Sequence, residues 1–369
     1  MIATGWTTAT RLLCVRLDTM GDVLMTTPAM KALKASRPDR SITLLTSARG
    51  AAVAALVPEI DDVIVYDAPW MKATQRRDNR RDHGMVEHLS ARGFEAAVIF
   101  TVYSQSPLAS AFLCFLAGIP LRLAHCRENP YELLTDWVKD PEPRSGVRHE
   151  VRRQLDLVAA VGSRTHDESM SLDVPGGARR RALELLAQAG IDSERPWVAL
   201  HPGASAPSRR YSPEGFAAVA RRLVVEAGLQ VVLTGAPDEE DLTEYIRAKT
   251  RAPLGSVAGR AGVPVLCALL SRASLLISNN TGPVHIAAAL GTPVVDLYAL
   301  TNPQHTPWGV AHRVLCHDVS CKWCYASVCP EGHHNCLAKV SPDDVYEAAC
   351  ELLAETSSGV GLRTSVSRQ

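Results

Sequence analysis

The feature that most constrains the fold is a regular alternation of short apolar runs with amphipathic stretches. In the first half, residues 12–17, 42–45, 63–66 and 96–100 are predicted as buried strands. Helical stretches are predicted between them, after Asp22 and around residues 51–57 and 86–92. Short buried strands separated by helices are typical of an α/β protein with a parallel sheet.

The alternation stops between residues 136 and 176, where prolines and glycines bracket one predicted helix, 149–161. It resumes with helices and strands predicted at 179–189, 197–201, 214–227, 230–234 and 238–248. Because 369 residues exceed one ordinary core, we expect two similar α/β halves, 1–175 and 176–369. Ligands of such sheets bind beyond the carboxyl ends of the strands, so a cleft between the halves is predicted.

Composition narrows the classes of partner. The formal net charge is zero, which argues against nucleic acid, and only the basic run 76–81 indicates an anionic partner or a solvated loop. No run approaches the roughly 20 consecutive apolar residues of a membrane span. Residues 1–10 lack the charged start and apolar middle of a secretion signal, so a cytoplasmic location is expected.

The most informative motif is Ser-Asn-Asn-Thr-Gly-Pro-Val-His, residues 278–285, which follows a predicted strand at 275–277. Pro283 suits the first turn of a helix that ends at Gly291. The N–H groups and dipole at a helix start attract anions. With Thr281 and His285 on the same first turn, a diphosphate site is predicted; a simple helix cap is the alternative.

Three further loops follow predicted strands. Residues 18–22 place Asp22 at a helix start, where it serves either as an ionised general base or only to complement the helix dipole. Residues 201–212 combine small residues with Arg209 and Arg210, which suit phosphate unless they are solvated. Residues 234–240 deliver carboxylates that suit a ribose, although acidic residues are common in a first helical turn.

Together these loops resemble glycosyltransferase family 9, the heptosyltransferases that build the inner core of lipopolysaccharide. The resemblance runs from Arg11 to near Leu353 and is carried by residues 20–24, 201–205 and 278–285, the last followed by Ala-Ala-Ala-Leu-Gly at 287–291. Residues 301–303, Thr-Asn-Pro, are similar to the Thr-Asp-Pro segment of the family.

The resemblance implies a GT-B fold, with two Rossmann-like parallel-sheet domains facing a central cleft. It implies an acceptor-binding domain at 1–175 and a nucleotide-sugar-binding domain at 176–369, which includes a Cys-rich loop at 316–336 and a terminal helix. The implied reaction is an inverting, metal-independent transfer from a nucleotide-sugar, usually ADP-heptose. A single displacement fits the residues, since it needs one base and stabilisation of the leaving diphosphate.

The resemblance also assigns roles to residues. Asp22 matches the catalytic base of the family, and Thr281, Gly282 and His285 match the residues that hold the diphosphate. Arg209 stands where a lysine is common, and Asn280 stands where aspartate is common, which bears on the identity of the donor. Glu239 is preferred over Glu240 as the ribose ligand. The full predicted set is Asp22 as base; Ser205, Arg209, Glu239, Asn280, Thr281, Gly282 and His285 for the donor; and Gly21, Arg122 and Arg127 for the acceptor.

One region is not explained by these roles. Cys316, Cys321, Cys324, Cys329 and Cys336 lie within 21 residues, together with His317, His333 and His334. Reduced thiols in a structural loop are expected, while a zinc site and disulfide pairing remain alternatives. No catalytic role, no catalytic metal and no cofactor are predicted.

The predicted partners are a nucleotide-sugar, with ADP-heptose favoured, and a glycolipid or oligosaccharide acceptor. A lipid-linked acceptor implies peripheral contact with the inner leaflet of the inner membrane. Three alternatives remain open: a family 9 transferase for another nucleotide-sugar, a GT-B sugar-nucleotide epimerase, and a non-catalytic protein organised by metal.

Overall fold

The computed structural model describes residues 4–71 and 79–357, and the chain divides into two compact units, Met1–Asp173 and Val174–Gln369. This division falls two residues before the boundary predicted from sequence. The two units are described separately, and the cleft expected between them stays a prediction.

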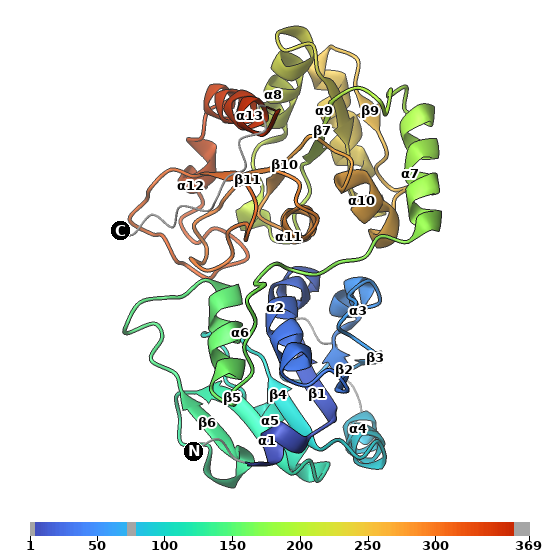
Figure 1. Cartoon of the computed structure of the whole chain (residues 1–369). Coiled ribbons are helices and arrows are strands. Elements are labelled where there is room, and N and C mark those ends of the chain that lie inside the picture. The colour runs from blue at the N-terminus through green and yellow to red at the C-terminus, as the bar shows by residue number, and fades with distance from the viewer. Residues whose placement is uncertain (1–3, 72–78, 358–369) are drawn as a thin grey trace. The chain divides into compact units, whose positions relative to one another are not determined.

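The first unit is built on a sheet of six parallel strands in the order β3-β2-β1-β4-β5-β6 (Figure 1). The strands are β1 Arg11–Arg16, β2 Ser41–Thr46, β3 Asp62–Val65, β4 Ala96–Ile99, β5 Leu121–Cys126 and β6 Asp136–Lys139. In the centre, β1 pairs with β2 on one side and with β4 on the other. All four positions of β4 and five of the six of β1 are buried, as expected for strands covered on both faces.

Helices cover this sheet: α1 Thr4–Thr8, α2 Met20–Ser36, α3 Ala48–Ala54, α4 Arg80–Ala91, α5 Leu108–Leu116 and α6 Glu150–Ala159, with a 3₁₀ turn, η1, at Tyr131–Leu133. Helix α2 packs against α3 and α6, while α4 packs against α5. The sequence pattern located β1 to β4 but did not predict β5 and β6. Strand β5 carries the buried polar residues Arg122 and His125, and β6 is only half buried, so neither forms a continuous apolar run.

The second unit repeats the same topology with the strand order β12-β11-β10-β7-β8-β9. Its strands are β7 Trp197–His201, β8 Gln230–Leu233, β9 Gly255–Ser256, β10 Leu275–Asn279, β11 Val294–Leu297 and β12 His312–Leu315. Its helices are α7 Gly176–Gln188, α8 Pro213–Val225, α9 Glu240–Thr250, α10 Val263–Leu270, α11 Gly282–Ala289, α12 Asn335–Ala338 and α13 Pro342–Ser357, with 3₁₀ turns η2 at Pro207–Arg209 and η3 at Pro237–Glu239.

The order of strands determines where ligands bind. In each sheet the direction of strand addition reverses at the centre, between β1 and β4 and between β7 and β10. Such a reversal leaves a crevice beyond the carboxyl ends of the two central strands. Residues 18–22, 201–212 and 278–285 lie where β1, β7 and β10 end, so the motifs selected from the sequence lie at these carboxyl ends.

Candidate functional site

The donor motif lies at the junction of β10 and α11. Asn279 ends the strand, Thr281 has an extended backbone at the N-cap, and Gly282 and Pro283 begin the helix. The backbone N–H of Val284 already donates to the Thr281 carbonyl oxygen at 3.0 Å, which closes the first turn. A helix N-terminus with its outward N–H groups therefore lies at the carboxyl edge of the sheet.

Asn279 joins this junction to the loop at residues 201–212, which the sequence predicts to hold the donor. Its Oδ1 accepts the backbone N–H of Tyr211 at 2.9 Å, and its Nδ2 donates to the Pro202 carbonyl oxygen at 2.7 Å. Both ends of residues 201–212 are thus tied to one fully buried amide. Because the amide oxygen and the amide nitrogen of this buried side chain both make hydrogen bonds to the loop, Asn279 fixes the conformation of the loop.

Asn280 is directed into the protein. Its Nδ2 donates to Asp296 Oδ2 at 2.9 Å and to the His305 carbonyl oxygen at 2.8 Å. Burial raises the pKa of Asp296 well above its usual range, and the hydrogen bond from Asn280 opposes that rise. The amide is therefore a neutral donor matched to a buried carboxyl group, which gives a structural reason for asparagine here.

We expect Asn280→Asp to lower the free energy of unfolding by about 3 kcal/mol, because two buried carboxyl groups would then face each other. Carboxyl groups with raised folded-state pKa values are stabilised at low pH and lose that stability as the pH rises. The loss should accordingly be smaller at about pH 5 than at about pH 8 in urea titrations. The double variant Asn280→Asp/Asp296→Asn should recover part of the lost free energy of unfolding. If it recovers none, the hydrogen bond between residues 280 and 296 does not explain the loss.

The two arginines of the second loop differ. Arg209 Nε donates to Thr301 Oγ1 at 3.2 Å, so the Thr-Asn-Pro segment at 301–303 lies beside the donor loop. Arg210 Nε donates to the Ala204 carbonyl oxygen at 2.8 Å, within its own loop. Ser205 is exposed on this loop. These contacts favour Arg209 over Arg210 as the residue placed for phosphate.

Glu239 reaches the second loop and Glu240 does not. A Cβ at Gly203 would lie 2.0 Å from Glu239 Oε1, whereas Glu240 packs against Gly259. Glu239 Oε2 accepts the backbone N–H of Ala236 at 2.8 Å. It also lies 3.8 Å from Nε2 of His201, whose pKa burial lowers to about 4. The imidazole is neutral at physiological pH, so this contact is not an ion pair.

Asp22 lies in the first turn of α2, after β1. Its Oδ2 accepts from the backbone N–H of Thr19 at 3.0 Å and from Thr19 Oγ1 at 2.8 Å. Its Oδ1 accepts from Arg16 Nη2 at 3.1 Å. Thr19 and Asp22 thus form a capping box at the start of α2, a role that the sequence analysis did not predict, and these contacts also hold the carboxylate in one orientation.

Arg16 was not singled out from sequence, yet it organises this end of the sheet. The guanidinium is fully buried and pairs with Asp18 at 3.1 Å, Asp22 at 3.1 Å and Glu150 at 2.8 Å. Burial raises the pKa values of Asp18 and Glu150, and the charge of Arg16 opposes both shifts. The sequence feature that could have identified Arg16 is a charged residue at the end of an otherwise apolar strand, Leu-Leu-Cys-Val-Arg. Asp296 within the apolar strand Val-Val-Asp-Leu is a similar case.

The predicted acceptor residues are not alike. Gly21 is buried in the first turn of α2. Arg122 Nε donates to the Leu133 carbonyl oxygen at 2.8 Å and Nη2 to the Glu132 carbonyl oxygen at 2.7 Å, and the guanidinium lies over the Phe115 ring. This geometry favours a structural role for Arg122. Arg127 is exposed just after β5. Of the basic run 76–81, residues 76–78 lie outside the described residues.

Comparison with known proteins identifies the class. A sequence model of glycosyltransferase family 9 (heptosyltransferase) matches residues 86–335. Lipopolysaccharide heptosyltransferase 2 of Escherichia coli (strain K12) is 27% identical over 360 residues, covering 94% of this chain and 99% of that protein. Lipopolysaccharide heptosyltransferase 3 of Escherichia coli is 26% identical, covering 78% and 82%.

Solved structures agree on the fold. The family 9 glycosyl transferase of Veillonella parvula DSM 2008 has a TM-score of 0.77 at 23% identity, covering 94% of this chain and 98% of that one. E. coli ADP-heptose lps heptosyltransferase II has a TM-score of 0.73 at 23% identity, covering 94% and 100%. The two parallel six-stranded sheets are thus those of a GT-B glycosyltransferase. The chain belongs to glycosyltransferase family 9, the heptosyltransferase family.

Proposed function

We propose that this glycosyltransferase moves a heptose from ADP-heptose to a lipopolysaccharide-core or related glycan acceptor, with inversion and without a metal at the reacting centre. The observation that carries the donor half is the amide of Asn279, which ties the loop of Arg209 to the helix start at Gly282. The names of the relatives, lipopolysaccharide heptosyltransferases 2 and 3, support the transferred sugar and the acceptor class, and the name of the solved E. coli ADP-heptose lps heptosyltransferase II supports the nucleotide.

The donor end supplies stabilisation for a leaving nucleoside diphosphate. The first-turn N–H groups of α11 carry partial positive charge, and Thr281 and the buried His285 lie on the same turn. Arg209 adds a full positive charge from the neighbouring loop. In this proposal these groups act on the charge that grows as the bond from the anomeric carbon to the diphosphate oxygen breaks.

The base is Asp22. As the acceptor hydroxyl oxygen attacks the anomeric carbon, its proton passes to the carboxylate, and the diphosphate leaves with the bonding electron pair. One such displacement inverts the anomeric centre. Three hydrogen-bond donors, two from Thr19 and one from Arg16, hold the carboxylate ready for this step.

In this proposal Glu239 recognises the donor ribose. We expect Glu239→Gln to raise KM for ADP-heptose about tenfold or more with a smaller change in kcat, since one charged hydrogen-bond acceptor is lost. The carboxamide oxygen can still accept from Ala236, so the loop should stay folded. Glu240→Gln, beside Gly259, is the matched control and should leave KM within about twofold. Equal effects in both variants would refute the ribose role.

The acceptor side includes a proposed peripheral contact with the inner leaflet. No helix in the described part of the chain is both long and apolar enough to cross a membrane. Helix α5 instead leaves Phe112, Phe115 and Leu116 about half exposed, which is unusual for such large apolar side chains on one short helix. This face is the observation in favour of contact with a lipid-linked acceptor.

The experiment that tests the function incubates the purified protein with ADP-, UDP-, GDP- and dTDP-sugars, each with and without a lipopolysaccharide-precursor extract. Nucleotide release is measured, with EDTA in parallel. Acceptor-dependent release of ADP alone, unaffected by EDTA, supports the proposal. Release of another nucleotide would overturn the ADP-heptose assignment. Conversion of a nucleotide-sugar to its epimer without an acceptor and without nucleotide release, read by NMR of the same incubations, would favour the epimerase alternative.

A further inference from the structure

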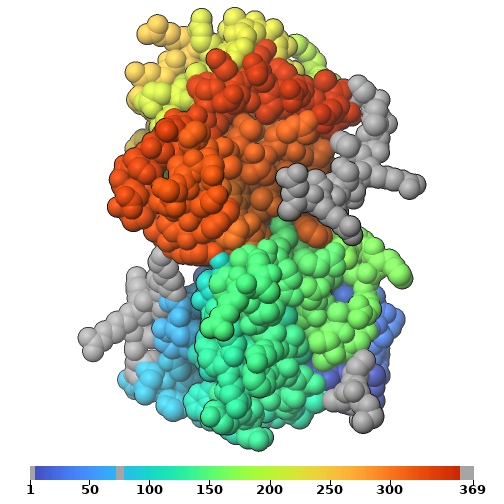
Figure 2. Space-filling model, turned by 90° about the vertical axis from the view of Figure 1, so that its left-hand side faces the viewer, coloured from blue at the N-terminus to red at the C-terminus, as the bar shows by residue number. Residues whose placement is uncertain are grey.

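The segment between β12 and α12 has an unusual construction. Residues 316–334, all of which the structure describes, form no helix or strand. Trp323, Tyr325 and Val328 are 38%, 45% and 64% exposed, so the large apolar side chains of the loop are directed outward. Figure 2 shows the orange-red residues of this region forming part of the molecular surface. A long irregular loop without an apolar interior needs another source of order.

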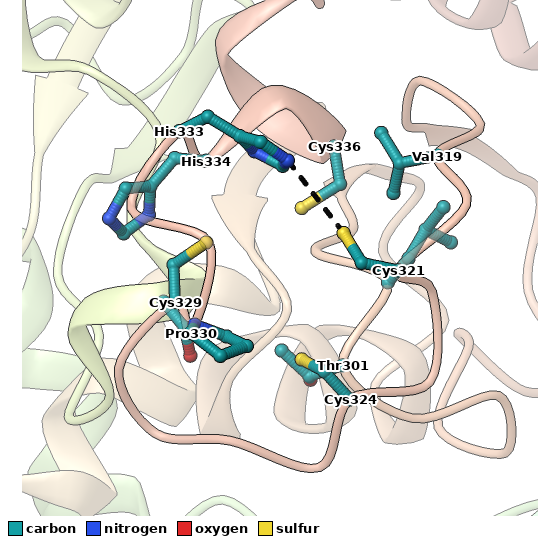
Figure 3. A pocket seen from close by; sticks show the side chains of 11 residues that line it. Thr301, Val319, Cys321, Cys324, Cys329, Pro330, His333, His334 and Cys336 are labelled. Carbon is teal, nitrogen blue, oxygen red and sulfur yellow. Dashed lines mark hydrogen bonds between the residues drawn. The ribbon is translucent and has the colours of Figure 1, made fainter.

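Sulfur and imidazole groups occupy much of the interior, beside Leu300, Val319 and Pro330. A cavity of about 20 Å³, the size of one water or one ion, is lined by Cys321, Cys324, Cys329, Cys336, His333 and His334. In Figure 3 the four sulfurs are turned toward this cavity from different sides of the loop. Cys321 Sγ lies 3.9 Å from His333 Nε2. Each of the ten cysteines, all within the described ranges, is free.

The backbone around Cys324 is held in a special conformation. Its two neighbours, Trp323 and Tyr325, have φ angles of 63° and 52°, a left-handed region that bulky residues enter only when their surroundings require it. Their N–H groups donate to the carbonyl oxygens of Leu300 at 2.7 Å and Thr301 at 2.9 Å. The Cys-x-x-Cys turn of Cys321 and Cys324 is thus fixed to the body of the unit.

We propose that Cys321, Cys324, Cys329 and Cys336 are the four ligands of one structural zinc ion. A Cys-x-x-Cys pair with two further cysteines gives the closed tetrahedral thiolate set that zinc prefers. Among the described residues no group of side chains is already arranged to hold a metal ion, so binding must draw the four sulfurs closer together. Each thiol releases its proton to solvent as its sulfur binds.

The zinc site would order the donor loop without taking part in transfer. Ser208 donates from its backbone N–H to the Ser327 carbonyl oxygen at 3.0 Å and from Oγ to the Ala326 carbonyl oxygen at 2.7 Å. The next residue, Arg209, is the proposed diphosphate ligand and itself contacts Thr301. This consequence rests on the proposed function, whereas metal binding itself does not.

The first measurement is the metal content of the purified full chain after desalting. We expect about one zinc per chain, lost in Cys324→Ser and in Cys329→Ser. Two matched controls should retain it. These are Cys316→Ser, whose exposed thiol does not line the cavity, and Cys350→Ser, which lies on α13. Metal kept in Cys324→Ser, metal lost equally in Cys350→Ser, or iron in place of zinc would overturn the proposal.

A second measurement uses only the unaltered chain, so it does not depend on variants folding. Co²⁺ added to the reduced, metal-free protein should give the visible bands and sulfur-to-metal charge transfer of a tetrahedral thiolate site, and equimolar Zn²⁺ should abolish them. Absence of these bands, or two disulfides in the unreduced protein, would overturn the site. Neither the metal content nor the Co²⁺ spectrum requires a nucleotide-sugar. A failure of ADP-heptose transfer would therefore leave the zinc proposal intact. If both proposals hold, zinc removal should raise KM for the donor severalfold.

Discussion

Asp22→Asn is expected to lower kcat by about 10²- to 10⁴-fold, with KM for ADP-heptose within a fewfold of the unaltered enzyme. Asparagine keeps the size of the side chain and an oxygen that accepts from Thr19, but it cannot take a proton from the acceptor hydroxyl. The loss should therefore fall on the chemical step. Initial rates at saturating donor and acceptor measure it, and the anomeric configuration of the product, read by NMR, tests inversion.

The matched control is Asp18→Asn. Asp18 pairs with the same guanidinium, through Arg16 Nε at 3.1 Å, and accepts from Gln105 Nε2 at 2.7 Å, yet it is not the proposed base. A much smaller fall in kcat is expected for this variant. Equal falls for Asp18→Asn and Asp22→Asn would mean that both carboxylates act only by neutralising Arg16, and the assignment of the base would then be wrong.

Arg16→Met is expected to lower the free energy of unfolding by about 3–5 kcal/mol, because one buried guanidinium pairs with three carboxyl groups that would lose this partner. Methionine replaces much of the volume but none of the charge. Asp18 and Glu150 already have pKa values raised by burial, and the loss of Arg16 raises them further. Groups with raised folded-state pKa values lose stability as the pH rises, so the deficit should be larger at about pH 8 than at about pH 5.

Urea titrations of both proteins at the two pH values provide the measurement. Arg16→Lys is the informative control, since it retains the charge without the planar fork that serves three partners. Its stability should lie between those of the other two proteins. A deficit that is the same at both pH values would show that lost packing, rather than unpaired carboxylates, explains the Met variant.

Much of the fold could be predicted from sequence, and the reason is burial. Strands β1, β4, β7 and β10 lie in the centres of their sheets, so they read as apolar runs. Strands β5 and β6 do not form apolar runs in the sequence. Strand β5 contains Arg122, which donates to backbone carbonyl oxygens, and β6 is a half-buried strand at the edge of the sheet. Central strands can be predicted from their apolar composition. Edge strands form because of contacts with neighbouring elements, and these contacts cannot be read from the sequence.

The candidate site divides in a similar way. Residues in local motifs, such as Thr281 and Asp22, were found because a strand end and a helix start adjoin in sequence. Arg16 with Glu150, and Asn280 with Asp296, were missed as pairs because their meaning depends on contacts between elements. Glu239 and Glu240 could not be separated by sequence, since the packing of Gly203 and Gly259 distinguishes them. The roles of all these residues in catalysis stay predictions.

The close approach of Gly203 to Glu239 couples these two positions sterically. A methyl group at 203 would lie 2.0 Å from the carboxylate, so alanine there must displace the side chain at 239. Alanine at 203 would therefore act on the proposed ribose ligand, because the flexible end of Glu239 would have to turn away from the loop.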